Sequence, residues 1–267
     1  MILRSALPIL TFGLLIAVVG DRLAEARRKA EPFETANQTI SAIHRLDSDT
    51  MASDVSVDGP GSARRPAVDR IARLATRQQL SREAGTTYLD SLLLSTDSVV
   101  RRWPDRPGDP IRVAIVEGGT PEYSPRMAGF MRESLQRWET IGIGVRFEVV
   151  RDTSDAEVVV HWIDRFDFDR AGQTDLTWDQ AGHVRRAVIS LALRTSTGVP
   201  FPDNALLAVA VHEAGHALGL PHSSDSNDVM FPATRTGVLS ERDRRTASVL
   251  YQLPPGPVRD VLADAAN

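Results

Sequence analysis

The sequence of 267 residues contains no cysteine. Disulfide bonds and thiolate metal ligands are therefore excluded, and a metal site would have to use histidine or carboxylate ligands. Lysine is also nearly absent, because Lys29 is the only lysine among the 31 basic residues. The net charge of −4 is too close to neutral to indicate a nucleic-acid partner or an anionic membrane surface.

The sequence also lacks a typical membrane-spanning run near its start. The apolar run Leu7 to Val19 follows Arg4 and is short for a span, but it is typical of the core of a signal peptide. Ala24-Glu25-Ala26 offers a cleavage pattern. An uncleaved anchor through residues 2–19 is the alternative, although the arginines that come after it count against export of the C-terminal side. Either interpretation of residues 1–26 predicts an extracytoplasmic protein, secreted or membrane-anchored.

Residues 27–95 differ in composition from the rest of the chain. Residues 31–63 are polar and predict a flexible stalk or linker, whereas residues 66–84 have helical spacing and several arginines. The whole segment could alternatively be a pro-region. Because there is no cysteine, latency through a pro-region cysteine on the metal is impossible, so a carboxylate or steric cover would have to replace it.

From about residue 96 the pattern predicts strands alternating with helices. Residues 124–140 should form a helix with a core face that carries Met127, Phe130, Met131, Leu135 and Trp138. The strongly apolar run at 156–162 suits a strand that is buried on both faces, as in a parallel sheet. Further strands are expected at 98–103, 111–116, 145–150 and 185–193, with a short edge strand at 174–178.

Three of the six histidines lie in one short stretch, as H-E-x-x-H-x-x-G-x-x-H. The Ala- and Leu-rich run 205–218 predicts a helix, capped by Asp203 or Asn204. His212 and His216 are four residues apart and project from one helix face, so both can bind one metal ion. Gly219 can adopt positive φ, end the helix and let the chain bring His222 in as a third ligand.

Three protein ligands leave a fourth coordination position open, which is the catalytic form of a zinc site. Glu213 lies between the two helical histidines, where its carboxylate can take a proton from a water molecule. The pattern thus indicates one catalytic Zn²⁺ ion, held by His212, His216 and His222. The alternative interpretation is that His212 and His216 are ordinary histidines of a helix and bind no metal.

The extended motif followed by Met230 resembles the metzincin pattern of zinc endopeptidases. Ser223 after the third histidine, the segment to Met230-Phe231-Pro232, and Leu239 to Asp243 running on to Leu250-Tyr251 resemble the matrixin branch, of bacterial type. The resemblance spans residues 98–253. It implies an α+β metzincin (zincin-like) catalytic domain at 96–256, with a short tail at 257–267.

The implied fold has a twisted, mostly parallel sheet with an antiparallel edge strand, an active-site helix, an irregular lower subdomain and a C-terminal helix capped by Ser240. The implied activity is that of an exported zinc endopeptidase, in which the intact Glu213 would act as general base on a zinc-activated water. Met230 would form a hydrophobic floor. Protein or peptide substrates and a monomer are expected. The alternative is a non-catalytic binding module that retains its zinc site.

Two further metal sites can be considered from the remaining ligand residues. Outside the motif, only His161 and His183 remain in this domain, too few for the second, structural zinc of animal matrixins. An acidic loop around Gly172 could bind calcium through Asp164, Asp167, Asp169, Asp175 and Asp179. The alternative is a solvated surface loop without a metal.

Overall fold

The computed structural model describes residues 65–94 and 98–258. The chain divides into the units Met1–Pro60 and Gly61–Asn267, and every described residue belongs to the second. The expected signal peptide or anchor and most of the linker lie outside the described residues. No helix within the described part is long and apolar enough to cross a membrane.

A five-stranded sheet forms the centre of the fold, in the order β3-β2-β4-β6-β5. β2, β3, β4 and β6 are mutually parallel, and β5 pairs antiparallel with β6 at one edge. The predicted mostly parallel sheet with an antiparallel edge strand is therefore confirmed. The strand bounds are β2 (Ile111–Ile115), β3 (Phe147–Val150), β4 (Val158–Ile163), β5 (Gly172–Trp178) and β6 (Val184–Ala192).

Strand β4 lies in the middle of this sheet, between β2 and β6, as its unbroken apolar run predicts. Val158 and Val160 point into the main core, while Val159 points to the other face and packs with Ala114 and Ala156. The alternation follows from the two-residue period of a strand.

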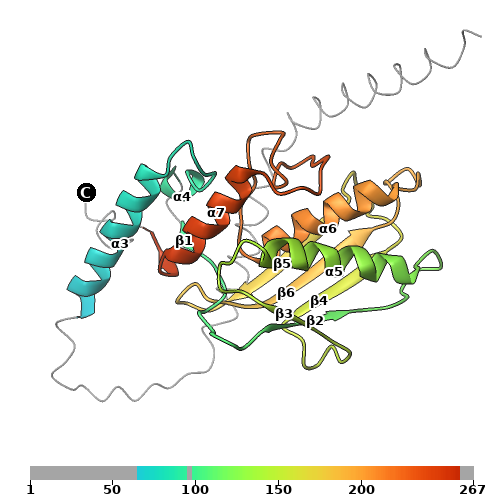
Figure 1. The fold of residues 1–267 in the computed structure, drawn as a ribbon, viewed down its shortest axis with the longest axis horizontal. Coiled ribbons are helices and arrows are strands. Elements are labelled where there is room, and N and C mark those ends of the chain that lie inside the picture. The colour runs from blue at the N-terminus through green and yellow to red at the C-terminus, as the bar shows by residue number, and fades with distance from the viewer. Residues whose placement is uncertain (1–64, 95–97, 259–267) are drawn as a thin grey trace, which may run out of the picture. The chain divides into compact units, whose positions relative to one another are not determined.

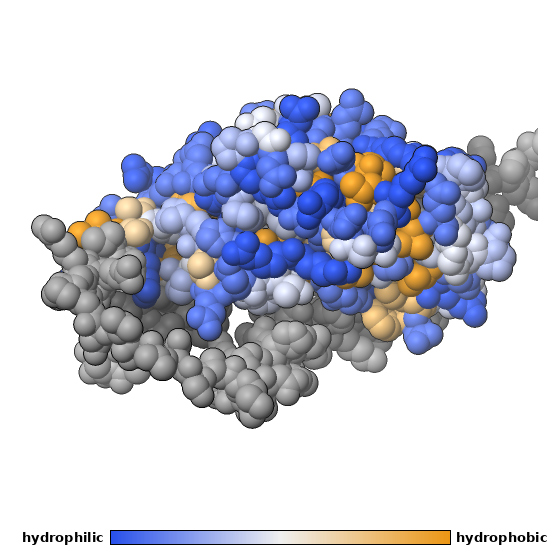
Figure 2. All heavy atoms as spheres, turned by 90° about the horizontal axis from the view of Figure 1, so that it is seen from below, coloured by the Kyte–Doolittle hydropathy of each residue, from blue (hydrophilic) through white to orange (hydrophobic). Residues whose placement is uncertain are grey.

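Seen from below, the molecule is mostly hydrophilic, with a hydrophobic area toward the right of the view (Figure 2).

Two helices, α5 (Pro125–Glu139) and α6 (Asp203–Ala217), cover the same face of the sheet (Figure 1). They pack against each other, and α6 also packs on β5 and β6. The expected core face of α5 is confirmed for Met127, Met131, Leu135 and Trp138, which are buried, and Phe130 packs partly buried against them. The Trp138 indole Nε1 donates to the Val211 carbonyl at 2.8 Å, which joins α5 to α6 beside the histidines.

After α6 the chain is irregular until α7 (Glu241–Gln252), as expected for the lower subdomain. Ser240 is the N-cap of α7, and its hydroxyl accepts from the Asp243 N–H. The segment before the sheet contains α3 (Arg65–Arg82) and α4 (Ser91–Leu94). Side chains of residues 79–88 contact α7, for example Glu83, whose carboxylate lies 2.7 Å from the Arg245 guanidinium.

Two local expectations are wrong. The strand expected at 98–103 is only β1 (Val99–Val100), which pairs with β7 (Gly256–Pro257), while Arg102 forms an isolated bridge with His183 just before β6. The partner strand β7 lies more than 150 residues away, so no local pattern could reveal the pairing. The N-cap of α6 is Pro202, with no side-chain cap, and Asp203 is the first helical residue. Beyond β7, Val258 is buried and its N–H donates to the Ser98 carbonyl.

Candidate metal centre

The helix α6 carries the first two histidines and is apolar nearly all round, so it lies buried between α5 and the sheet. His212 and His216 stand one turn apart on it, with ring centroids 4.7 Å apart. His212 is buried, whereas His216 is partly open. The packing of α6 therefore holds both imidazoles in place, while His216 remains partly accessible to solvent.

The turn after α6 brings the third histidine back. Gly219 has φ of +95°, and the Leu220 N–H donates to the Gly215 carbonyl at 3.1 Å, which closes the helix end. His222 then lies over the helix, with its ring centroid 4.7 Å from that of His216 and 5.3 Å from that of His212. Within the described residues, these three are the only group of three potential metal ligands, with ligand atoms all within 4.8 Å of one another.

The orientation of the rings fits a metal ion. His212 Nδ1 lies 2.7 Å from the Val229 carbonyl, and His216 Nδ1 lies 2.8 Å from the Leu220 carbonyl. Because a carbonyl oxygen can only accept, each Nδ1 must carry the proton, and each Nε2 then presents a lone pair. Nε2 of His216 and Nε2 of His222 are 3.1 Å apart. The donor set thus suits a Zn²⁺ ion with three protein ligands.

The electrostatics keep these rings neutral, as metal ligands must be. Burial lowers the pKa of His212, and burial together with the two neighbouring imidazoles lowers the pKa of His216. Desolvation, His212 and the Arg170 guanidinium lower the pKa of His222 to about 4, although this residue remains accessible to solvent. The cluster is therefore an uncharged set of nitrogen donors at neutral pH.

Glu213 lies beside the histidines and is 4% exposed. The Thr174 hydroxyl on β5 donates to its carboxylate Oε2 at 2.7 Å. Burial raises the pKa of Glu213 to about 7, and the Thr174 hydrogen bond and the Arg170 charge oppose that rise. Gly172 leaves room for this carboxylate, since a Cβ there would stand 2.5 Å from Oε1.

Replacing Thr174 by valine should destabilise the metal-free protein by about 2 kcal/mol, since a buried carboxylate would lose its hydroxyl donor without a change in side-chain shape. Chemical denaturation measures the loss. Thr177→Val, on the exposed side of the same strand, is the matched control and should change stability by less than about 0.5 kcal/mol. Equal losses in both variants would contradict this account of Glu213.

Met230 lies under α6 and is fully buried. A Cβ at Gly215 would collide with its sulfur and would stand 2.8 Å from the Trp138 ring, so position 215 favours glycine. The Met230 carbonyl accepts from the Ser223 N–H at 2.8 Å, next to His222. Met230 thus packs against Gly215 in the core beneath the histidines' helix.

Sequence reasoning misses Thr174, Gly172 and Arg170 as neighbours of Glu213. It predicts residues 174–178 only as an edge strand, and nothing local indicates which side chain of that strand faces α6. The five aspartates of the acidic loop do not form a ligand group: Asp164 lies near Arg165 and Arg194, and Asp179 near Arg185.

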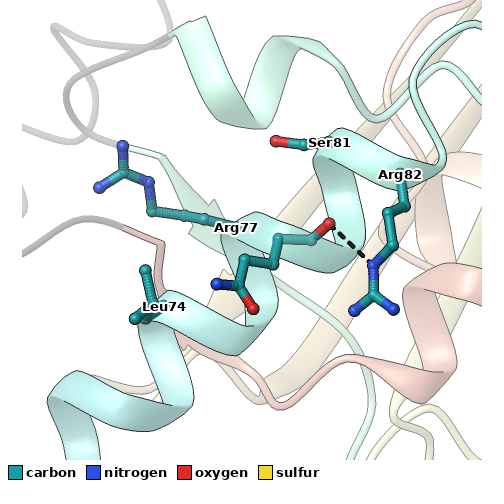
Figure 3. A pocket seen from close by; sticks show the side chains of 5 residues that line it. Leu74, Arg77, Ser81 and Arg82 are labelled. Atoms are coloured by element: carbon teal, nitrogen blue, oxygen red, sulfur yellow. Dashed lines mark hydrogen bonds between the residues drawn. The ribbon is translucent and has the colours of Figure 1, made fainter.

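A hollow on α3 offers no comparable chemistry. It is lined by Leu74, Arg77, Gln78, Ser81 and Arg82 (Figure 3). All five side chains come from one helix, and Arg82 Nε donates to the Gln78 carbonyl of that helix at 3.3 Å. Because no polar groups from separate elements converge there, the histidine cluster is the candidate site.

Comparison with known proteins agrees with this geometry. Residues 120–252 match the family model of the matrixins, peptidase M10. Matrilysin of Felis catus is 44% identical over 55 residues, which cover 21% of this chain and 18% of that protein. Interstitial collagenase B of Mus musculus is 37% identical over 71 residues, or 24% and 15% of the two chains. Matrix metalloproteinase-15 of Homo sapiens is 42% identical over 67 residues, or 23% and 10%.

The chain thus spans less than a fifth of the length of these relatives. Residues 120–252 are therefore similar to the matrixins, and the mostly parallel sheet with its antiparallel edge strand is consistent with the metzincin fold.

Proposed function

We propose that the chain contains a matrixin domain and is a zinc-dependent endopeptidase. The observation that carries the proposal is the convergence of His212, His216 and His222 beside a buried carboxylate. A structural zinc site needs no such carboxylate, whereas peptide hydrolysis needs a group that can move a proton. The matrixin match over residues 120–252 supports the same conclusion.

When bound at the three histidines, a zinc ion would supply Lewis-acid chemistry, lowering the pKa of a water molecule and polarising the scissile carbonyl. The contribution of the chain itself is proton transfer. Glu213 accepts the proton of the attacking water and later delivers it to the departing nitrogen. Its pKa, raised by burial to about 7, suits both steps at neutral pH, and Thr174 holds the carboxylate in place.

Strand β5 offers a way to hold the substrate. It lies at the edge of the sheet, next to α6, and within the described residues it pairs only with β6. An extended peptide can add to such an edge through main-chain hydrogen bonds, and it would then pass beside Glu213. Substrates are accordingly proteins or peptides in extended conformation.

Export is part of this proposal and is supported by the apolar run Leu7 to Val19, which lies outside the described residues. Sequencing the N-terminus of the natural protein distinguishes a cleaved signal from a retained anchor.

The full-length protein supplied with zinc should cleave a labelled, unstructured protein substrate. Removing the metal with a chelator should lower the rate by about 100-fold or more, and added zinc should restore it, because the three histidines have no other way to activate water. Undiminished cleavage after chelation would contradict a metal-dependent mechanism. Zinc binding without any cleavage would favour the non-catalytic module.

A further inference from the structure

The zinc ligands are connected to a segment that precedes the matrixin match. We propose that residues 83–90, called the strap below, position His212 and His222, with Tyr88 as the positioning residue. The strap is therefore a permanent part of the active enzyme rather than a removable pro-region. This inference rests on the zinc site of the proposed function.

The strap is packed firmly against α7. Thr87, Tyr88 and Leu89 are 0%, 5% and 1% exposed, respectively. The Tyr88 N–H donates to the Thr246 hydroxyl at 3.4 Å, and Glu83 pairs with Arg245. A cover that must leave during activation would not be expected to bury its side chains in the core of the domain it covers.

A chain of three hydrogen bonds leads from Tyr88 to the first ligand. The Tyr88 hydroxyl donates to Asp243 Oδ1 at 3.0 Å. Asp243 Oδ2 accepts from the Val229 N–H at 2.8 Å, and the Val229 carbonyl accepts from His212 Nδ1 at 2.7 Å. Asp243 is fully buried, so the rotation of its carboxylate depends on the groups that bind each oxygen.

A second connection leads to the third ligand. Arg242 Nη2 donates to the Thr87 carbonyl, and Arg242 Nη1 donates to Asp228 Oδ2, both at 3.2 Å. The same Asp228 oxygen accepts from the hydroxyl of Ser223, which follows His222 directly. The strap thus contacts Asp243 directly and Asp228 through Arg242. Asp243 binds the backbone of Val229, which contacts His212, and Asp228 binds the side chain of Ser223, which follows His222.

Burial, reinforced by the negative charge of Asp243, raises the pKa of the Tyr88 phenol. Tyr88 therefore remains a hydrogen-bond donor throughout the working range of pH. Groups in the second shell of a metal site orient the ligands, and their loss weakens metal binding.

The test is Tyr88→Phe in the full-length protein, with Tyr123→Phe as matched control, because the Tyr123 hydroxyl has no hydrogen-bond partner among the described residues. Zinc affinity is measured by competition with a chelating indicator, and ligand geometry by the visible spectrum of the cobalt-substituted protein. Tyr88→Phe should weaken zinc binding by about 5-fold and shift the cobalt bands, while Tyr123→Phe should do neither.

A double-variant cycle tests the route. Asp243→Asn should weaken zinc binding by about 10-fold or more, and adding Tyr88→Phe should cost nothing further if Tyr88 acts through Asp243. If Asp243→Asn does not fold, Arg242→Gln is used instead. It removes the hydrogen bonds of the second connection and should also weaken zinc binding. Lower stability of Tyr88→Phe with unchanged zinc affinity and cobalt spectrum would overturn the proposal. Zinc binding by a protein that cleaves no substrate would refute the proposed function, and the affinity comparison would still decide the role of the strap.

Discussion

Glu213→Ala is expected to lower kcat by a factor of about 10² to 10⁴ while zinc remains bound, because this is the range that a positioned general base contributes. The carboxylate is not one of the three converging ligands, so its removal should leave the nitrogen donors in place. Since Glu213 is buried, Glu213→Gln provides a companion variant that keeps the side-chain volume and should be equally inactive.

Zinc content and thermal unfolding of both variants separate lost chemistry from lost structure. Glu148→Ala, on the exposed side of the opposite edge strand β3, is the control for loss of a carboxylate and should keep full activity. Activity of Glu213→Ala equal to wild type would refute proton transfer by this residue. If the variant instead lost its zinc, the role of Glu213 would be to hold the site together.

The elements that the sequence predicts well are those with a strong local pattern. The 3.6-residue spacing of Met127, Met131 and Trp138 predicts the buried face of α5, and the apolar run of β4 predicts its central place. The spacing of the motif similarly indicates that His212 and His216 share one helix face. Each of these inferences depends only on residues within a few turns or one strand.

The features that cannot be predicted in this way depend on contacts between distant parts of the chain. Nothing near Tyr88 indicates that its hydroxyl meets Asp243, 155 positions later. The sequence predicts Ser240 as the cap of the last helix, but it does not indicate that Asp243 binds the Val229 N–H. The role of Thr174 likewise follows from the packing of β5 on α6, which only the assembled sheet defines.

Gly219 depends both on its local sequence, which predicts the end of the helix, and on a contact with the distant Arg101. The substitution Gly219→Ala is therefore expected to have a large effect. Its φ of +95° disfavours any residue with a Cβ by about 1 to 2 kcal/mol. A Cβ here would also collide with the Arg101 carbonyl oxygen, so the backbone itself would have to move. We expect the free energy of unfolding to fall by about 3 kcal/mol or more, measured by chemical denaturation of the metal-free protein.

Gly142→Ala separates the two causes, because Gly142 has φ of +77° and nothing lies within 4 Å of a Cβ built there. That variant should lose only the conformational part, about 1 kcal/mol. Zinc binding should separate the two variants further. The turn at Gly219 places the Leu220 carbonyl, which accepts from His216 Nδ1, and the chain then leads to His222. Only Gly219→Ala should therefore weaken zinc binding. Equal effects on stability and zinc affinity would mean that the contact with Arg101 has no role in shaping the site.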